Sequence, residues 1–147
     1  MSRKPLLFVM LVSLLTAGWL SQAVAGDVEK AKKRVVIQVS TNDEETQTMA
    51  MNNAVNLQKL YGMDNVEIEI VAYGPGLGML TKKNKDASRV KSLATQNITF
   101  SACGNTITGI EKKTGKKPEL TDGVKVVEAG VARIMELQDE GYAYIRP

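Results

Sequence analysis

The feature that most constrains the fold of this chain is a regular alternation of strand-like and helix-like segments. From residue 34 onward, short apolar runs of strand length are each followed by a helical pattern or a glycine-rich turn. The expected strands are 34–40, 66–73, 97–102, 124–128 and 142–145, and the main expected helices are 41–61, 87–95, one through Ile107 that stops at Gly115, and 131–140. Units of this kind join parallel strands by right-handed crossovers. The sequence therefore predicts an α/β fold with a mainly parallel, five-stranded sheet between helical layers.

The first 25 residues have a different pattern, typical of a secretory signal. Two basic residues precede the apolar run 6–15, and Ala23-Val24-Ala25 supplies the small residues of a cleavage site. The apolar run is shorter than the roughly 20 residues that a membrane span needs, although an uncleaved anchor is the alternative interpretation. We therefore expect a periplasmic or secreted protein with a cleaved signal peptide, a polar lead-in and a single α/β domain, at residues 1–25, 26–33 and 34–147.

Composition excludes several kinds of site. The chain has no His and one Cys, which rules out a Ser-His-Asp triad, a His-ligated zinc and an iron–sulfur cluster held by several cysteines. We expect no metal and no cofactor. The formal net charge of +3 falls to +1 once Arg3 and Lys4 are removed with the signal. We therefore expect no nucleic-acid partner and, after signal cleavage, no association with a membrane.

The sharpest candidate site residue is Cys103, which follows the third expected strand at the start of a helix. The carboxyl ends of parallel strands meet at one edge of a sheet, where ligands bind. At a helix N-terminus, unpaired N–H groups and the helix dipole stabilise a thiolate. Gly104 leaves room beside the sulfur, and Asn105 and Thr106 add hydrogen-bond donors. The alternative is that Cys103 only fills space, since free cysteines are often buried.

Two more loops at the same edge carry candidate pocket residues. The run Gly74-Pro75-Gly76-Leu77-Gly78 offers backbone N–H groups of the kind that bind anions, but it lacks the P-loop ending and the spacing of a dinucleotide fingerprint. The other interpretation is a tight turn that shapes the pocket beside Cys103. The predicted pocket or anion-binding residues are Asn42, Gly74, Gly76, Gly78, Gly104, Asn105 and Thr106.

Two further patterns predict local structure. Thr41 and Glu44 fit a capping box for the helix that Gly62 ends. Its expected buried face, at helical spacing, is Ala50, Ala54, Leu57 and Tyr61. A lysine cluster near Gly115 either docks an acidic partner or is a solvated helix end, and the second interpretation is favoured; it comprises Lys112, Lys113, Lys116 and Lys117.

With these elements in place, the chain resembles the DsrE/DsrF-like family, whose members include sulfur-relay proteins, and in particular its small exported branch. The matching stretches are Val35–Ser40, Ile68–Leu80 with Tyr73-Gly74-Pro75-Gly76-Leu77, Val90–Ile107 with Ile98-Thr99-Phe100-Ser101-Ala102-Cys103-Gly104-Asn105-Thr106, and 129–147. The resemblance implies a flavodoxin-like three-layer sandwich and assembly as homo-oligomers, from dimers to hexamers. It also implies that Cys103 has the position of the reactive cysteine of the relay members.

The leading hypothesis is an exported sulfur-binding or sulfur-transfer protein, a sulfurtransferase or sulfur carrier. Cys103 would accept sulfane sulfur as a persulfide from a donor and pass it to an acceptor, either of which can be a protein. The alternative is a non-catalytic oligomeric module that binds a small ligand or a protein, with Cys103 only packing. Replacing Cys103 would abolish transfer in the first case and leave binding intact in the second.

Overall fold

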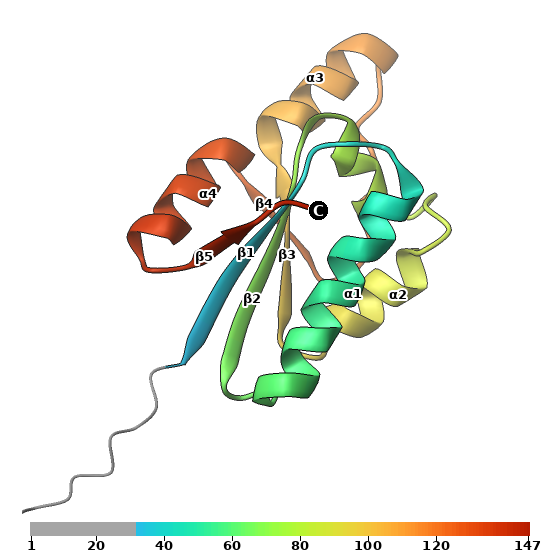
Figure 1. The fold of residues 1–147 in the computed structure, drawn as a ribbon. Coiled ribbons are helices and arrows are strands. Elements are labelled where there is room, and N and C mark those ends of the chain that lie inside the picture. Colours follow the sequence, from blue (N-terminus) through green and yellow to red (C-terminus); the bar gives the residue numbers. More distant parts are fainter. Residues whose placement is uncertain (1–31) are drawn as a thin grey trace, which may run out of the picture.

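The computed structural model describes residues 32–147 and has the predicted alternation of strands and helices (Figure 1). Its elements are β1 (Lys33–Val39), α1 (Glu44–Tyr61), β2 (Val66–Ala72), the 3₁₀ helix η1 (Gly74–Leu80), α2 (Ala87–Ala94), β3 (Ile98–Cys103), α3 (Gly104–Thr114), β4 (Val124–Val127), α4 (Gly130–Asp139) and β5 (Ala143–Ile145). The predicted signal and most of the predicted lead-in lie outside the described residues, and β1 begins one residue before its expected start. Within residues 32–147, no helix is both long and apolar enough to cross a membrane.

The sheet has the strand order β4-β3-β2-β1-β5, and all of its strand pairings are parallel. From β1 to β4 the chain steps in one direction, so right-handed crossovers place α1, α2 and α3 on one face. The step from β4 back past β1 to β5 reverses direction and places α4 alone on the opposite face (Figure 1). The prediction of a mainly parallel, five-stranded α/β sandwich is confirmed.

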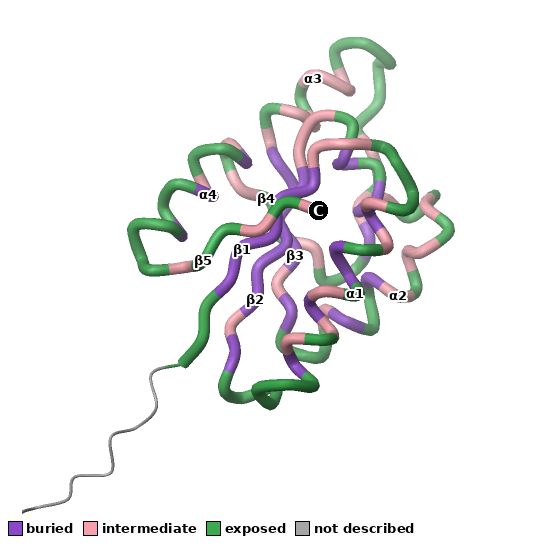
Figure 2. Tube along the Cα trace, viewed as in Figure 1, coloured by how far each residue is buried: buried purple, intermediate pink, exposed green. Residues whose placement is uncertain are grey.

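The two faces of the sheet carry apolar cores of different size. The larger core joins the strands to α1, η1 and α2, with Phe100, Ile37 and Met51 fully buried. The smaller core joins Val36 and Val71 to α4. Figure 2 shows buried residues along β1, β2 and β3, whereas α4 and β5 are largely exposed. The central strands therefore form a rigid platform, and their carboxyl ends carry the loops described below.

The start of α1 corrects one local prediction. Asp43, not Thr41, is the N-cap: its Oδ1 accepts hydrogen bonds from the Thr46 N–H at 2.7 Å and the Thr46 hydroxyl at 2.6 Å. The Thr41 hydroxyl instead accepts from the Asp43 N–H at 3.1 Å, before the helix begins. Aspartate is a preferred N-cap residue, and its carboxylate also interacts favourably with the positive end of the helix dipole.

The buried face of α1 is also rotated from the one expected. Ala50 and Ala54 are buried as predicted and Leu57 is partly buried against the larger core, but Tyr61 is 36% exposed. Two glutamines lie on the buried face instead: the Gln47 amide donates to the Thr41 carbonyl, and the Gln58 amide donates to the Gln96 carbonyl. Because these contacts satisfy the polar groups, glutamine replaces the apolar residues that periodicity alone would place there.

Candidate functional site

Cys103 is both the last residue of β3 and the N-cap of α3. Side chains alternate along a strand, and Phe100 and Ala102 point into the larger core. Ser101 and Cys103 therefore face the side of the sheet that α4 covers. A Cβ built on Gly130, the first residue of α4, would lie 3.3 Å from Cys103 Cβ, which places the start of α4 directly against this cysteine.

The fold brings two helix starts together at this point. β3 and β4 are neighbours in the sheet, with Cys103 paired to Val127. The helix after β3 runs to one face and the helix after β4 runs to the other, so the two connections diverge. A crevice at the carboxyl ends of adjacent strands with diverging connections is the usual ligand site of an open α/β sheet. Cys103 lies at this switch point.

Four polar groups near the sulfur lower the pKa of the Cys103 thiol, although its side chain makes no cap bond to α3. They are the Thr106 hydroxyl and the backbone N–H groups of Gly130, Thr106 and Asn105. The Asn105 N–H also donates to the Glu128 carbonyl at 3.1 Å, so we assign most of the effect to the Thr106 and Gly130 donors. Burial of Cys103, which is 6% exposed, raises the pKa of its thiol, but these donors together outweigh burial and hold that pKa below its ordinary value.

Thr106 links the sulfur to the glycine-rich turn after β2. The Gly74 N–H donates to Thr106 Oγ1 at 2.9 Å. The oxygen accepts this bond, which leaves the hydroxyl proton free to donate to another group such as the Cys103 sulfur. The Gly76 N–H donates to the Tyr73 carbonyl at 3.1 Å. These two N–H groups are therefore used within the protein, which favours the tight-turn interpretation of this segment over the anion-binding one.

Three glycines allow backbone segments to approach closely around the site. A Cβ on Gly76 would lie 2.3 Å from the Val39 carbonyl oxygen, and one on Gly104 would lie 3.1 Å from the Val127 carbonyl oxygen. A Cβ on Gly130 would lie 3.1 Å from the Tyr73 side chain. Each glycine thus fills a place that a larger residue would disturb.

The structure places Gly104, Asn105 and Thr106 directly after Cys103 in the first turn of α3, and Gly74 is hydrogen-bonded to Thr106. Asn42, on the loop before α1, and Gly78, in η1, are exposed. Among the residues that the structure describes, neither is hydrogen-bonded to the group around the sulfur.

Gly130 is the site residue that the sequence analysis missed. Ala129-Gly130 lies between the expected strand 124–128 and the expected helix 131–140, at the same edge of the sheet as Cys103. That pattern is a usable signal, since a glycine at a helix start lets a backbone N–H approach a neighbour closely. It does not show that β4 lies beside β3, and that neighbourhood is what brings Gly130 to the sulfur.

A buried ion pair lies on the same face, below the cysteine. Glu69 on β2 is 5% exposed, and it accepts from Arg133 Nε and Nη2, each at 2.9 Å, one bond to each carboxylate oxygen. The Ser101 hydroxyl donates to the same carboxylate at 2.7 Å. Glu69 raises the pKa of Arg133, which stays fully charged. Paired at two points, Glu69 is a compensated buried charge.

A cavity of about 520 Å³ opens between α4 and β4 beside this ion pair. Ser101, Lys125 and Arg133 contribute polar groups to its wall. Val127 and Ala129 also line it. They lie at the end of β4 and just before α4, where the segment 127–130 packs on Cys103 and Gly104. The cavity therefore lies next to the switch point rather than on the distant side of the molecule.

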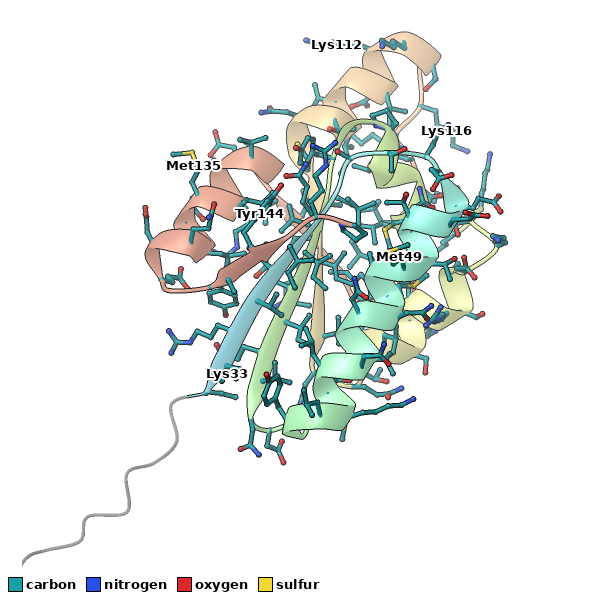
Figure 3. All side chains as sticks on the ribbon, viewed as in Figure 1. Lys33, Met49, Lys112, Lys116, Met135 and Tyr144 are labelled. Carbon is teal, nitrogen blue, oxygen red and sulfur yellow. The ribbon has the colours of Figure 1, made fainter. Side chains whose placement is uncertain are left out.

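The predicted lysine cluster lies at the far end of α3. Figure 3 shows Lys112 and Lys116 there, well away from the sheet. Lys116 contacts Glu119 at 3.7 Å and Lys117 contacts Glu111 at 3.8 Å, and all four lysines of the cluster are exposed. Acidic neighbours on the same segment favour the interpretation of a solvated helix end.

Comparison with known proteins identifies a family and solved structures of similar fold. Residues 33–147 match the model of the DsrE/DsrF-like family. The chain is similar to the solved structure of a protein of unknown function, MTH1491 from Methanobacterium thermoautotrophicum, with 34% identity and a TM-score of 0.71, over 79% of this chain and all of that one. It shares its fold with the ychN protein from E. coli, with 14% identity and a TM-score of 0.63, over 79% of this chain and 99% of that one. No protein of curated function matches the chain.

Proposed function

This chain belongs to the DsrE/DsrF-like family, which includes sulfur-relay proteins, and we propose that its own task is to bind or transfer sulfane sulfur on Cys103. The observation that carries the proposal is the setting of that sulfur. It lies at the start of α3 with the first residue of α4 packed against it, and the nearby Thr106 hydroxyl and Gly130 N–H lower the pKa of the thiol. Such donors stabilise a thiolate, which is the nucleophilic form of cysteine.

The proposed step is a thiol–persulfide exchange. The Cys103 thiolate attacks the terminal sulfur of a persulfide donor, R–S–S–H. A new S–S bond forms at Cys103, the donor S–S bond breaks, and its electron pair leaves on the thiolate R–S⁻. The proton stays on the terminal sulfur, so Cys103 becomes Cys–S–S–H. An acceptor thiolate reverses the exchange, and no external oxidant or reductant is consumed.

In this step the donors around Cys103 have two roles. Before attack they raise the fraction of thiolate at neutral pH. After attack they remain in place to stabilise the persulfide anion that forms when Cys–S–S–H releases its proton to solvent, as preorganised donors hold developing charge in other sites. The Thr106 hydroxyl is fixed for this by the bond that it accepts from Gly74.

A second function is favoured by one specific observation. Cys103 is only 6% exposed, as a residue that serves only for packing would be. In that case the chain is a binding module without sulfur chemistry. Alkylation of the folded protein separates the two functions. A reactive site requires Cys103 to be alkylated under native conditions, whereas a packing cysteine reacts only after denaturation. Cys103→Ala supplies the unreacted baseline.

We also propose that the protein is exported and assembles with itself. The proposal of export comes from the signal-like sequence of residues 1–25. Self-assembly is supported by large apolar side chains exposed on β4 and α4, where Val126, Val131 and Met135 are each more than half exposed. Figure 3 shows Met135 projecting outward from α4. Native mass spectrometry of the chain from residue 26 should show a multiple of one chain mass, and a monomer would contradict this.

A further inference from the structure

The helix that supplies the Gly130 N–H is anchored unevenly along its length. The second half of α4 is held by Ile134 and Leu137, which pack in the smaller apolar core. The first turn has no such apolar anchor, because Gly130 has no side chain and Val131 is 54% exposed. Arg133 has the long, inward-facing side chain of this turn. It lies three residues after Gly130, on the same face of the helix.

Arg133 ties this first turn to the sheet. Its guanidinium makes the two 2.9 Å bonds to Glu69 on β2, while Ser101 on β3 fixes the same carboxylate. The Arg133 N–H donates to the Ala129 carbonyl at 3.0 Å and closes the first turn of the helix. A continuous set of bonds therefore runs from the central strands through Arg133 to the residue that precedes Gly130.

We propose that Arg133 is a positioning residue for Cys103. Its two-point ion pair with Glu69, in the middle of β2, holds the first turn of α4 on the central strands, so that the Gly130 backbone stays packed beside Cys103. The inference rests on the proposed function, since it concerns the thiolate that would accept sulfur. The ion pair acts through the position of Gly130, and the bidentate fork of arginine makes that position specific.

The test is the pH dependence of alkylation by iodoacetamide, whose midpoint gives the pKa of the Cys103 thiol. The midpoint does not depend on how accessible the sulfur is, whereas the rate at one pH does. In Arg133→Met the midpoint should rise by about one unit, which is about a tenfold loss of thiolate below the midpoint. Arg133→Lys keeps the charge without the fork and should restore part of the shift. Tyr73, the titratable side chain packed at Gly130, is unchanged in these variants.

Two further variants keep the test decisive. Arg133→Met leaves the buried Glu69 carboxylate without its partner and can unfold the protein. The double variant Glu69→Gln with Arg133→Met removes both charges, and circular dichroism reports whether it folds. Lys91→Met is the matched control, because it removes an exposed 2.8 Å ion pair with Asp122 and should leave the midpoint unchanged.

An unchanged midpoint in a folded variant that lacks Arg133 would overturn the inference. Sulfur uptake by the wild type is measured separately. If the wild type accepts sulfur and the midpoint does not move, the positioning role alone is wrong. If the midpoint moves but no sulfur is accepted, the proposed function is wrong and the positioning of α4 stands.

Discussion

At the scale of single residues, the Thr106 side chain links two parts of the site, the glycine-rich turn after β2 and Cys103. It accepts the Gly74 N–H at 2.9 Å, and its hydroxyl lowers the pKa of the Cys103 thiol. Thr106→Val keeps the shape and removes the hydroxyl. A hydrogen bond to a charged group contributes about 1.5–3 kcal/mol, so the pKa of the Cys103 thiol should rise by about one to two units.

The pH midpoint of alkylation measures this rise. Thr106→Ser retains the hydroxyl and should stay near the wild type, and Thr108→Val, on an exposed position of the same helix, serves as the control. A Thr106→Val midpoint equal to that of the wild type would mean that the hydroxyl does not act on the sulfur.

Two glycines of the same turn should respond very differently to alanine. A Cβ on Gly76 would lie 2.3 Å from the Val39 carbonyl oxygen, so Gly76→Ala must push backbone apart and should lower the free energy of unfolding by about 3 kcal/mol. A Cβ on Gly78 meets nothing within 4 Å, and Gly78→Ala should change that free energy by less than about 1 kcal/mol. Urea denaturation measures both. Equal losses would contradict the packing described for η1.

At the scale of elements, the start of α1 predicts a pH-dependent stability. The Thr46 hydroxyl and N–H hydrogen-bond the Asp43 carboxylate and hold its pKa below the ordinary value of 3.8. A lowered native pKa stabilises the fold above the unfolded pKa, and that stabilisation is lost as pH falls through the native pKa. Asp43→Ala should therefore lower the urea midpoint at neutral pH, and the difference from the wild type should shrink below about pH 4.

The control for this prediction is Thr41→Ala. Thr41 was expected to be the cap from its spacing to Glu44, but its hydroxyl only accepts the Asp43 N–H. A hydroxyl does not titrate in this range, so the loss in Thr41→Ala should be smaller and should not depend on pH. A larger loss in Thr41→Ala than in Asp43→Ala would restore the original capping assignment.

The elements themselves could be predicted well, because strand and helix periods are local properties of the chain. The strands and helices have at least one end about one residue from the predicted position, except that α3 ends before Gly115 as predicted and α1 begins at Glu44, three residues after its expected start at 41. The buried face of α1 could not be predicted in the same way. Gln47 and Gln58 are buried because backbone carbonyls satisfy their amides, that of Thr41 six residues earlier and that of Gln96 on a distant segment, and apolar spacing carries no record of such partners.

At the scale of the whole molecule, the candidate site depends on strand order rather than on any motif. The position of Cys103 at a strand end could be predicted, together with its neighbours Gly104, Asn105 and Thr106. The contribution of Gly130 could not, because it requires β4 to lie beside β3 and the chain to reverse direction there. The Glu69–Arg133 ion pair is likewise a product of topology, since it joins residues on β2 and α4. The local sequence therefore predicts Cys103 and its neighbours, whereas the contacts with Gly130 and the ion pair follow from the order of the strands.

The central claim is that Cys103 accepts sulfane sulfur, and intact-mass spectrometry tests it most directly. The chain from residue 26 is incubated with polysulfide beside the Cys103→Ala variant, and both are measured before and after treatment with a reductant. The wild type alone should gain the mass of one or more sulfur atoms, and the reductant should remove the gain. An unchanged wild-type mass, in a folded protein whose thiol is alkylated only after denaturation, would contradict the account and make Cys103 a packing residue.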